Sequence, residues 1–270
     1  MSLRLPGLLA LLLLSACAAP SESDDEDVSG DEAAILGGGI ERGYPSVGAL
    51  VKPAPGGINI GSGTLIAPDL VLTAAHVASM GPVTFYYGLP PAGKDPKHIY
   101  LRSVEVDSVI VHPCYHRHPL DSCPGPSSEP IDVALVKLKT PIRDVAPTPI
   151  IDEPLRYLWG LISPYEDDSC VAVGFGAHLD DQGKASMAMR RSARAKVDDV
   201  GETELVTVRD TGIATGGDSG GPLLCSGKII GTVRGSAGAV PKTSPLERTR
   251  EAYERIDLHR AWIKAQIAGR

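Results

Sequence analysis

A serine set among glycines is the clearest chemical signal in this chain. The run Gly216 to Leu223 reads GGDSGGPL and places Ser219 between Gly217 and Gly220. A serine hydroxyl attacks a carbonyl efficiently only when a base takes its proton and donors stabilise the oxyanion that forms. Because glycine permits tight turns and close backbone approach, we expect the N–H groups of Gly217 and Ser219 to point into one oxyanion pocket. The run therefore predicts nucleophilic acyl transfer at Ser219.

Two architectures place a serine in such a run. Gly217, Ser219 and Gly221 also fit the G-x-S-x-G pattern of the strand-to-helix elbow in α/β-hydrolases. That elbow needs a helix directly after the serine, but the Gly-Gly-Pro that follows Ser219 disfavours a helix start. The elbow's order of serine, acid and histidine would also leave only His259 as the base. We therefore disfavour an α/β-hydrolase esterase.

A better base and an acid lie upstream of the serine. His76 ends the run TLIAPDLVLTAAH, and Asp132 begins the run DVALVKL. The motifs TAAH, DVAL and GDSGGP, in this order, resemble those of the chymotrypsin-like (trypsin family) serine proteases. The resemblance covers residues 35–270 and implies a catalytic triad. In that triad Ser219 attacks the scissile carbonyl, His76 takes and returns the proton, and Asp132 orients His76.

Short runs of β-forming residues separated by turns favour a sandwich or a barrel over alternating strands and helices. The resemblance implies an all-β fold of two antiparallel six-stranded Greek-key β-barrels that meet at about residues 145–165. A terminal α-helix is expected at about residues 257–268, with Asp257 as its N-cap and with Trp262 and Ile263 on its apolar side. The predicted strands are residues 47–51, 63–67, 83–87, 104–111, 134–138, 170–175, 205–208 and 229–233.

The first 34 residues differ from the rest. Arg4 precedes an apolar run at residues 8–14, which is typical of a secretory signal peptide and too short to span a bilayer. The following LSAC resembles a bacterial lipobox. It predicts a signal peptide at residues 1–16, a lipid on Cys17 and an acidic linker or propeptide at residues 17–34. Ordinary cleavage among the small residues beside Cys17 is the alternative.

The cysteine count supports the lipid hypothesis. Five cysteines cannot all form disulfides with one another, but setting Cys17 aside leaves four, which allow three pairings. The family resemblance selects Cys170 with Cys225 and leaves Cys114 with Cys123. Other disulfides of the family are missing from this chain.

Three residues stand where the family usually has cysteines. Gly61 and Val77 occupy the places of the pair that flanks the catalytic histidine, and Thr215 replaces a cysteine beside the nucleophile.

The loop HPCYHRHPLDSC invites a metal hypothesis. It holds His112, His116, His118 and two cysteines within twelve residues. Zinc ligands usually come in paired CxxC or HxxxH units, and an oxidising environment favours a disulfide. We therefore expect no metal site and no cofactor.

The sequence AILGG at residues 34–38 resembles the family's activation site. In that family, cleavage exposes an isoleucine-type α-amino group, which turns inward and pairs with the aspartate before the catalytic serine. The resemblance assigns these roles to Ile35 and Asp218. Because a buried carboxylate without a partner is costly, the new cation would order the oxyanion loop. The same cut would release the catalytic body from Cys17.

Two residues bear on substrate preference, and they favour different substrates. Ile213, six residues before Ser219, resembles the floor of the family's specificity pocket, and an apolar floor predicts small or apolar residues before the scissile bond. A carboxylate on the pocket wall at Glu251 would instead attract a basic side chain. Arg234 to Ser236 stand where relatives read Ser-Trp-Gly, which places Arg234 near the triad aspartate and Ser236 at the pocket.

Charge argues against one class of partner. The formal net charge is −7, of which Arg4 and seven acids in residues 1–34 account for −6 and the rest of the chain for −1. A nearly neutral body gives no electrostatic reason for nucleic-acid binding. We expect an exported, monomeric serine endopeptidase that acts on protein or peptide substrates and touches a membrane only through Cys17. It would be an envelope lipoprotein or secreted after cleavage. A catalytically silent binding protein on the same scaffold is the alternative.

Overall fold

The computed structural model describes residues 35, 38–89, 100–115, 130–155, 170–176, 178–179, 185–186, 189–237 and 250–269, all within the compact unit Asp31–Arg270. The predicted signal peptide, Cys17, His116, His118 and Cys123 lie outside these residues. The described elements are β1 (Gly39–Ile40), β2 (Val47–Ala54), β3 (Gly57–Ala67), β4 (Leu70–Thr73), α1 (Ala75–Ser79), β5 (Thr84–Leu89), β6 (Tyr100–Val111), β7 (Ala134–Leu138), β8 (Cys170–Gly174), β9 (His178–Leu179), β10 (Ala185–Ser186), β11 (Arg191–Val200), β12 (Glu204–Arg209), β13 (Pro222–Cys225), β14 (Lys228–Ser236), β15 (Arg250–Arg255), the 3₁₀ turn η2 (Ile256–His259) and α2 (Arg260–Ala268).

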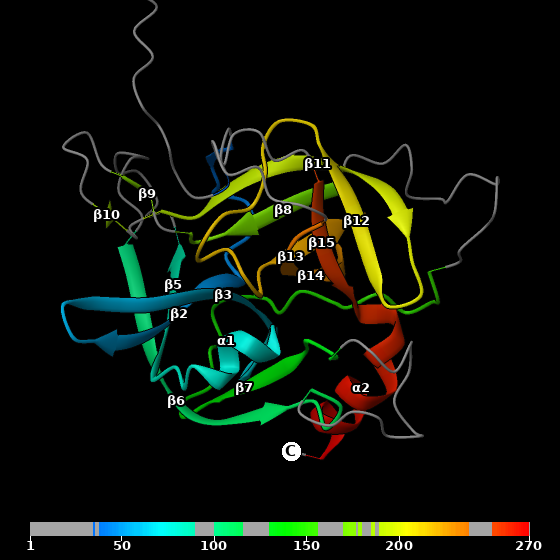
Figure 1. The fold of residues 1–270 in the computed structure, drawn as a ribbon. Helices are drawn as coiled ribbons and strands as arrows, with labels where there is room; N and C mark the ends of the chain where they lie inside the picture. Colours follow the sequence, from blue (N-terminus) through cyan, green and yellow to red (C-terminus); the bar gives the residue numbers. More distant parts are fainter. Residues whose placement is uncertain are drawn as a thin grey trace, which may run out of the picture. The chain divides into compact units, whose positions relative to one another are not determined.

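The strands close into two antiparallel six-stranded barrels (Figure 1). The first barrel runs β2-β3-β4-β7-β6-β5 and closes where β2 pairs with β5. The second runs β8-β11-β12-β15-β14-β13 and closes where β13 pairs with β8, while β1 adds to its edge on β11. The predicted fold class is confirmed.

Residue alternation explains why these segments are strands. In β11, Ala193, Ala195 and Val197 are buried while Arg194, Lys196 and Asp198 between them face solvent, as expected for an antiparallel strand with one wet face. The buried faces of the two barrels merge. A single cluster of buried side chains includes Leu72 of the first barrel together with Val173 and Ile230 of the second. The barrels therefore share one core.

The chain ends in a helix, as predicted, but Asp257 is not its N-cap. Residues 256–259 form the 3₁₀ turn η2, and α2 begins only at Arg260, with no side-chain cap on its N-cap residue His259. The Asp257 carboxylate instead accepts hydrogen bonds from the Leu155 N–H at 2.8 Å and from the Arg255 guanidinium at 2.7 and 3.0 Å. These charge-assisted bonds use both carboxylate oxygens, so Asp257 anchors the segment after the first barrel rather than the helix.

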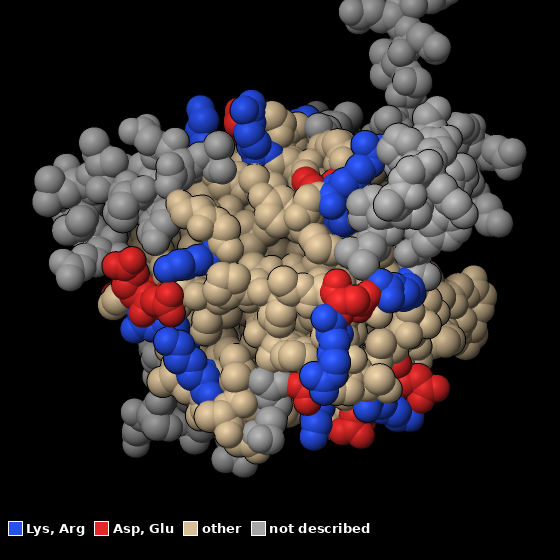
Figure 2. Space-filling model, turned by 180° about the vertical axis from the view of Figure 1, so that it is seen from behind, with Lys and Arg blue, Asp and Glu red and all other residues tan. Residues whose placement is uncertain are grey.

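Charges of both signs are spread over the face seen in Figure 2. Elsewhere in the described residues the ion pairs on the surface include Arg102 with Asp144, Arg250 with Asp198, Lys139 with Glu105 and Lys228 with Asp152. Exposed pairs of this kind contribute little to stability. Within the described part of the chain, no helix has the length and apolar character needed to cross a bilayer.

Gly61 and Val77, which stand where the family usually has a pair of cysteines, face each other in the structure. A Cβ built on Gly61 would lie 2.4 Å from Val77 Cγ1 and 3.2 Å from Val77 Cβ. The valine side chain thus fills the space beside the glycine. The 3.2 Å between the two Cβ atoms is only slightly below the roughly 3.5–4.5 Å found in a disulfide. The backbone at these two positions is therefore close to the geometry that a disulfide needs.

We predict that the double substitution Gly61→Cys with Val77→Cys forms a disulfide and stabilises the protein. Closing a loop of about 15 residues is worth about 3 kcal/mol through the unfolded state. The measurement is chemical unfolding of the oxidised double variant, with Gly61→Ala/Val77→Cys as the control that cannot form the bond. An oxidised variant no more stable than that control would contradict the geometry.

Candidate active site

The imidazole and the carboxylate of the predicted triad are in contact. His76 lies in the short helix α1, directly after β4, and Asp132 lies just before β7. Asp132 Oδ2 is 2.6 Å from His76 Nδ1, and Asp132 Oδ1 accepts a hydrogen bond from the His76 backbone N–H at 2.8 Å. The aspartate side chain is 7% exposed, whereas that of the histidine is 37% exposed. A buried carboxylate on Nδ1 fixes the ring and leaves Nε2 as the proton-accepting nitrogen.

The loop that carries Ser219 is anchored to the first barrel. The Ser219 carbonyl accepts a hydrogen bond from the Ser62 N–H at 2.8 Å, and the Ser62 hydroxyl donates to the Gly217 carbonyl at 2.9 Å. A Cβ on Gly220 would lie 2.1 Å from Thr73 Oγ1 and 2.8 Å from the Ala74 nitrogen. The serine loop thus packs closely against the residues that lead into His76, and only glycine fits at position 220.

Two backbone donors of this loop have no acceptor among the residues that the structure describes. The N–H groups of Asp218, Gly220 and Gly221 donate to the carbonyls of Thr215, Val233 and Asp218. Among the described residues, nothing accepts a hydrogen bond from the N–H of Gly217 or of Ser219. Gly217 has a φ of +98°, which favours glycine. An oxyanion hole requires a pair of N–H groups beside the serine that are available to donate hydrogen bonds to the substrate.

A buried carboxylate lies directly before the serine. Asp218 is fully buried, and its Oδ2 accepts hydrogen bonds from the Ile35 N at 2.9 Å and from the Thr215 N–H at 2.9 Å. Its Oδ1 accepts one from the Gly176 N–H at 2.8 Å. A Cβ on Gly174 would lie 2.1 Å from Oδ1, so this glycine makes room for the carboxylate. Burial raises the pKa of Asp218, and these hydrogen bonds partly oppose the rise.

The three predicted pocket residues lie on the second barrel. Ile213 is 4% exposed and Glu251 is 3% exposed. Glu251 lies in β15 between Thr207 of β12 and Ser236 of β14. Burial raises the pKa of Tyr253, two residues further along β15, and the nearby charges of Glu251 and Asp218 raise it as well. The Glu251 carboxylate and the Asp218 carboxylate, which directly precedes Ser219, therefore both act electrostatically on the Tyr253 ring.

The cysteines follow the predicted scheme where the structure describes them. Cys170 and Cys225 form a disulfide that joins β8 to β13, which confirms that pairing. Cys114 is also disulfide-bonded, and its predicted partner Cys123 lies outside the described residues. The strand β13 begins at Pro222, three residues after Ser219. A strand in place of a helix excludes the α/β-hydrolase elbow.

His112, at one end of the loop considered for zinc, is packed against other rings. Its imidazole lies 5.0 Å from that of His259 and 4.8 Å from the ring of Trp262, both edge-on. Burial lowers the pKa of His112 to about 4, and the charge of His259 contributes to the decrease. His112 is therefore neutral near pH 7 and links the end of β6 to the terminal helix.

Comparisons with known proteins agree with this architecture. Residues 45–263 match the Trypsin family model, so the chain belongs to the trypsin family. A thrombin-like enzyme, elegaxobin-1 of Protobothrops elegans, is 31% identical over 219 residues, which cover 77% of this chain and 85% of the relative. The snake venom serine protease homolog HS120 of Bothrops jararaca is 27% identical over 221 residues, or 77% of this chain and 78% of that protein.

Solved structures show the same fold at lower identity. A mouse neuropsin, described as a serine protease expressed in the limbic system of the brain, aligns with a TM-score of 0.59 and 23% identity. The alignment covers 86% of this chain and all of that one. A structure named GrC aligns with a TM-score of 0.63 at 20% identity, over 87% of this chain and all of its own.

Sequence reasoning missed two residues that support the site. Ser62 bonds both the serine loop and, through its hydroxyl, the Phe175 N–H at 2.9 Å. Glu254 is 1% exposed and accepts a hydrogen bond from the Asp132 N–H at 3.0 Å. No local motif marks either residue, because each acts on a segment more than 100 positions away. Glu254 lies in β15, whose sequence REAYER is mostly charged, so nothing local marks it as internal.

Proposed function

We propose that this protein is an exported serine endopeptidase that hydrolyses peptide bonds through an acyl-enzyme on Ser219. Membership of the trypsin family supports a serine peptidase. The observation that carries the proposal is the 2.6 Å contact of the buried Asp132 carboxylate with His76 Nδ1. It occurs beside a loop in which the N–H groups of Gly217 and Ser219 have no acceptor in the described part of the chain. A scaffold kept only for binding has no need of either feature.

In the proposed reaction, Ser219 Oγ attacks the carbonyl carbon of the scissile bond while His76 Nε2 takes the hydroxyl proton. The negative charge that develops on the carbonyl oxygen is stabilised by the N–H groups of Gly217 and Ser219. His76 then gives the proton to the leaving amine, and the carbon–nitrogen bond breaks to leave an acyl-serine. Water, deprotonated by His76, attacks this ester, and its proton returns to Ser219. Asp132 stabilises the imidazolium at both stages.

Ile213 and Glu251 are the proposed determinants of the substrate side chain before the scissile bond. The buried Ile213 favours small or apolar side chains. The buried Glu251 carboxylate favours a basic one, since it would neutralise a cation that enters the same pocket. Cleavage of a peptide library by the wild type and by Glu251→Gln separates the two effects. If Glu251 governs the preference, the glutamine variant loses cleavage after lysine and arginine and keeps cleavage after apolar residues.

The same library tests the proposed function. The purified protein, with Ser219→Ala as control, is incubated with the peptides, and the products are identified by mass spectrometry. Internal peptide bonds should be cut by the wild type alone. Equal cleavage in both samples, or none in either after the chain has been cut before Ile35, would favour the silent binding protein.

We further propose that the protein is made as a zymogen that is activated by a cut before Ile35. The Ile35 N is already at Asp218, but Ile35 has a φ of +49°. A β-branched residue is strained there by roughly 1–2 kcal/mol. Cleavage abolishes that dihedral angle and turns a neutral N–H into an ammonium. Both changes favour the inserted geometry and with it the ordered oxyanion loop.

We predict that cleavage at this bond raises kcat/KM by roughly 10²-fold or more, the magnitude of one oxyanion-hole contact, because the new ammonium holds the oxyanion loop in its ordered shape. An enteropeptidase sequence ending at position 34 gives a controlled cut, and Asp218→Asn in the same background should gain nothing. Because the folded pKa of Asp218 lies above its unfolded value in the uncut chain, ionising it costs stability as the pH rises through that range. The cut form should therefore have the higher Tm at pH 7, with the difference shrinking toward pH 4.

Lipidation of Cys17 would tie this activation to location. The segment between Leu5 and Glu41 contains no lysine or arginine. The activating protease must therefore accept a different residue before the bond that it cuts. A protease that prefers small residues, the enzyme itself included, could cut after Ala34. The uncut form would be membrane-bound and the active form soluble. Fractionation followed by activity assay tests this, and activity found only in uncut, membrane-bound protein contradicts it.

A further inference from the structure

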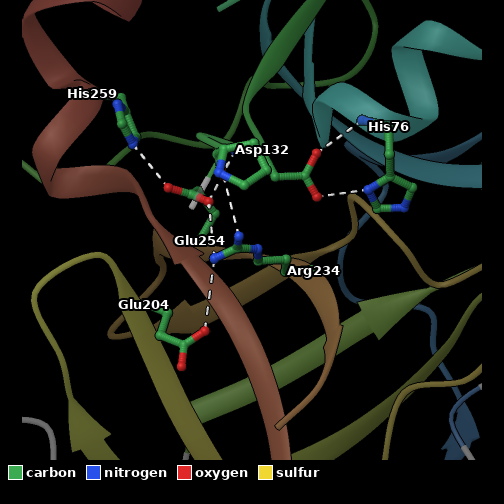
Figure 3. Close-up of polar contacts among 7 residues, drawn as sticks. His76, Asp132, Glu204, Arg234, Glu254 and His259 are labelled. Atoms are coloured by element: carbon green, nitrogen blue, oxygen red, sulfur yellow. Dashed lines mark hydrogen bonds and ion pairs between the residues drawn. The ribbon is translucent and has the colours of Figure 1, made fainter. Parts of the chain in front are cut away.

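A cluster of charged side chains lies behind the triad carboxylate (Figure 3). Arg234 extends from β14 and Glu254 from β15, while Glu204 from β12 and His259 from η2 flank them. Arg234 Nη1 is 3.9 Å from Glu254 Oε2 and 3.7 Å from Glu204 Oε2. His259 Nε2 is 3.2 Å from Glu254 Oε1. All four belong to the second barrel or to the turn that follows it.

Two members of this cluster hold the backbone around Asp132 from both ends. The Asp132 N–H donates to Glu254 Oε2 at 3.0 Å, and Arg234 Nη2 donates to the Pro130 carbonyl at 3.2 Å. In Figure 3, the Asp132 carboxylate points the opposite way, toward His76. The peptide segment 130–132 is thus held on one side by the second barrel while its carboxylate orients the imidazole on the other.

Burial makes the contact with Glu254 unusually well defined. The Glu254 and His259 side chains are each 1% exposed, and that of Arg234 is 19% exposed. A buried carboxylate persists only when hydrogen bonds and a cation replace water. Here one oxygen has the Asp132 N–H and Arg234, and the other has His259. Satisfying both oxygens fixes the position of the Glu254 side chain and hence of the Asp132 backbone.

The contact also bridges the two halves of the site. His76 and Asp132 lie on the first barrel, whereas Ser219 precedes β13 of the second. We propose that Glu254, paired with Arg234 and His259, is a positioning residue that fixes Asp132, and through it His76, relative to Ser219. This inference rests on the proposed peptidase function and adds to it a positioning role for the Glu254 side chain.

The test compares Glu254→Ala, which removes the acceptor of the Asp132 N–H, with Glu254→Gln, which keeps an oxygen there. Active sites are first counted with a fluorophosphonate, so that kcat refers to folded, reactive enzyme. We expect Glu254→Ala to lower kcat per titrated site by roughly 10- to 100-fold, the cost of misplacing a catalytic group by a fraction of an ångström to 1 Å. KM should change by less than about threefold, because substrate contacts are intact. Glu254→Gln should recover most of the lost kcat.

Glu204→Gln is the matched control. It removes a carboxylate from the same guanidinium, but its side chain is 36% exposed and lies further from Asp132. Its kcat should stay within about twofold of the wild type, as for an exposed ion pair. If Glu254→Ala is too unstable to purify, Arg234→Met provides the test, because it frees the Pro130 carbonyl and removes the cation from Glu254. It should lower kcat by about tenfold.

A second readout does not depend on turnover. The Nδ1–H proton of His76, assigned by its loss in His76→Gln, reports the hydrogen bond to Asp132 in a proton NMR spectrum. We expect its downfield resonance to shift or broaden in Glu254→Ala and to stay unchanged in Glu204→Gln. Wild-type kcat per titrated site together with an unchanged resonance in Glu254→Ala would overturn the inference. Failure of the wild type, cut before Ile35, to react with the fluorophosphonate would instead refute the proposed function, and the NMR comparison would still test positioning.

Discussion

Replacing Ser219 with alanine is expected to lower kcat/KM for peptide hydrolysis by roughly 10⁵- to 10⁶-fold, the loss seen when a nucleophilic serine is removed from a triad. The substitution deletes the attacking oxygen and leaves His76 with no hydroxyl to deprotonate. What remains is transition-state binding by the two N–H donors, which accounts for the small residual rate. Initial rates on a peptide found in the library experiment provide the measurement.

We expect the Ser219→Ala substitution to leave the fold and its stability almost unchanged. The hydrogen bond that ties Ser219 to the first barrel uses its carbonyl, which accepts from the Ser62 N–H, and alanine keeps that carbonyl. The side chain is only half-buried. We therefore expect Tm to move by less than about 2 °C. Activity above about 1% of the wild type in a preparation free of contaminating protease would mean that Ser219 is not the nucleophile.

Asp132→Asn is expected to lower kcat by roughly 10⁴-fold with little effect on KM, by analogy with the loss seen for a triad aspartate in a relative of this family. The contacts in this structure explain why. Oδ1 accepts from the His76 backbone N–H, so the amide oxygen of an asparagine must remain there. Its NH₂ group then takes the place of Oδ2, 2.6 Å from His76 Nδ1. An NH₂ group donates, so Nδ1 must accept, and the imidazole proton moves to Nε2.

A histidine protonated on Nε2 cannot take the serine proton. The asparagine variant should therefore fold and bind substrate but turn it over slowly. Asp144→Asn, which changes an exposed aspartate paired with Arg102 on the surface, is the control for charge alone. Comparable kcat values in Asp132→Asn and Asp144→Asn would contradict the assigned role of Asp132.

The fold could be predicted because its signals lie in short stretches of the sequence or in motifs that resemble those of a known family. Turn-separated β-forming runs and three ordered motifs were enough for two barrels, and all eight predicted strands overlap observed ones. The apolar strands β4 and β13 were missed because they are only four residues long, and two other missed strands have an unusual pattern. The strand β11 mixes arginine, lysine and aspartate with alanine, and β15 carries Glu251, Glu254 and Arg255 on buried positions. Such strands look polar in the sequence and are recognised only from their partners.

Features that depend on long-range contacts were also beyond the sequence. The helix α1 around His76 is five residues long, too short for a periodic signal. Aspartate is a common N-cap residue, but the Asp257 carboxylate accepts hydrogen bonds from the Leu155 N–H and from Arg255 instead. Arg234 was expected near the triad aspartate from the resemblance. That it contacts the Pro130 carbonyl and pairs with Glu254 follows only from the closure of β15 against β14.

The most direct test of the central claim is covalent labelling with a serine-directed phosphonate, followed by digestion and mass spectrometry. The claim is that a hydroxyl, an imidazole and a carboxylate from distant parts of the chain form one nucleophilic site. The protein cut before Ile35 should take up one label per chain, on the peptide that contains Ser219. Ser219→Ala should take up none, and Asp132→Asn should react far more slowly. No label on the cut wild-type protein, or a label on another residue, would contradict the account.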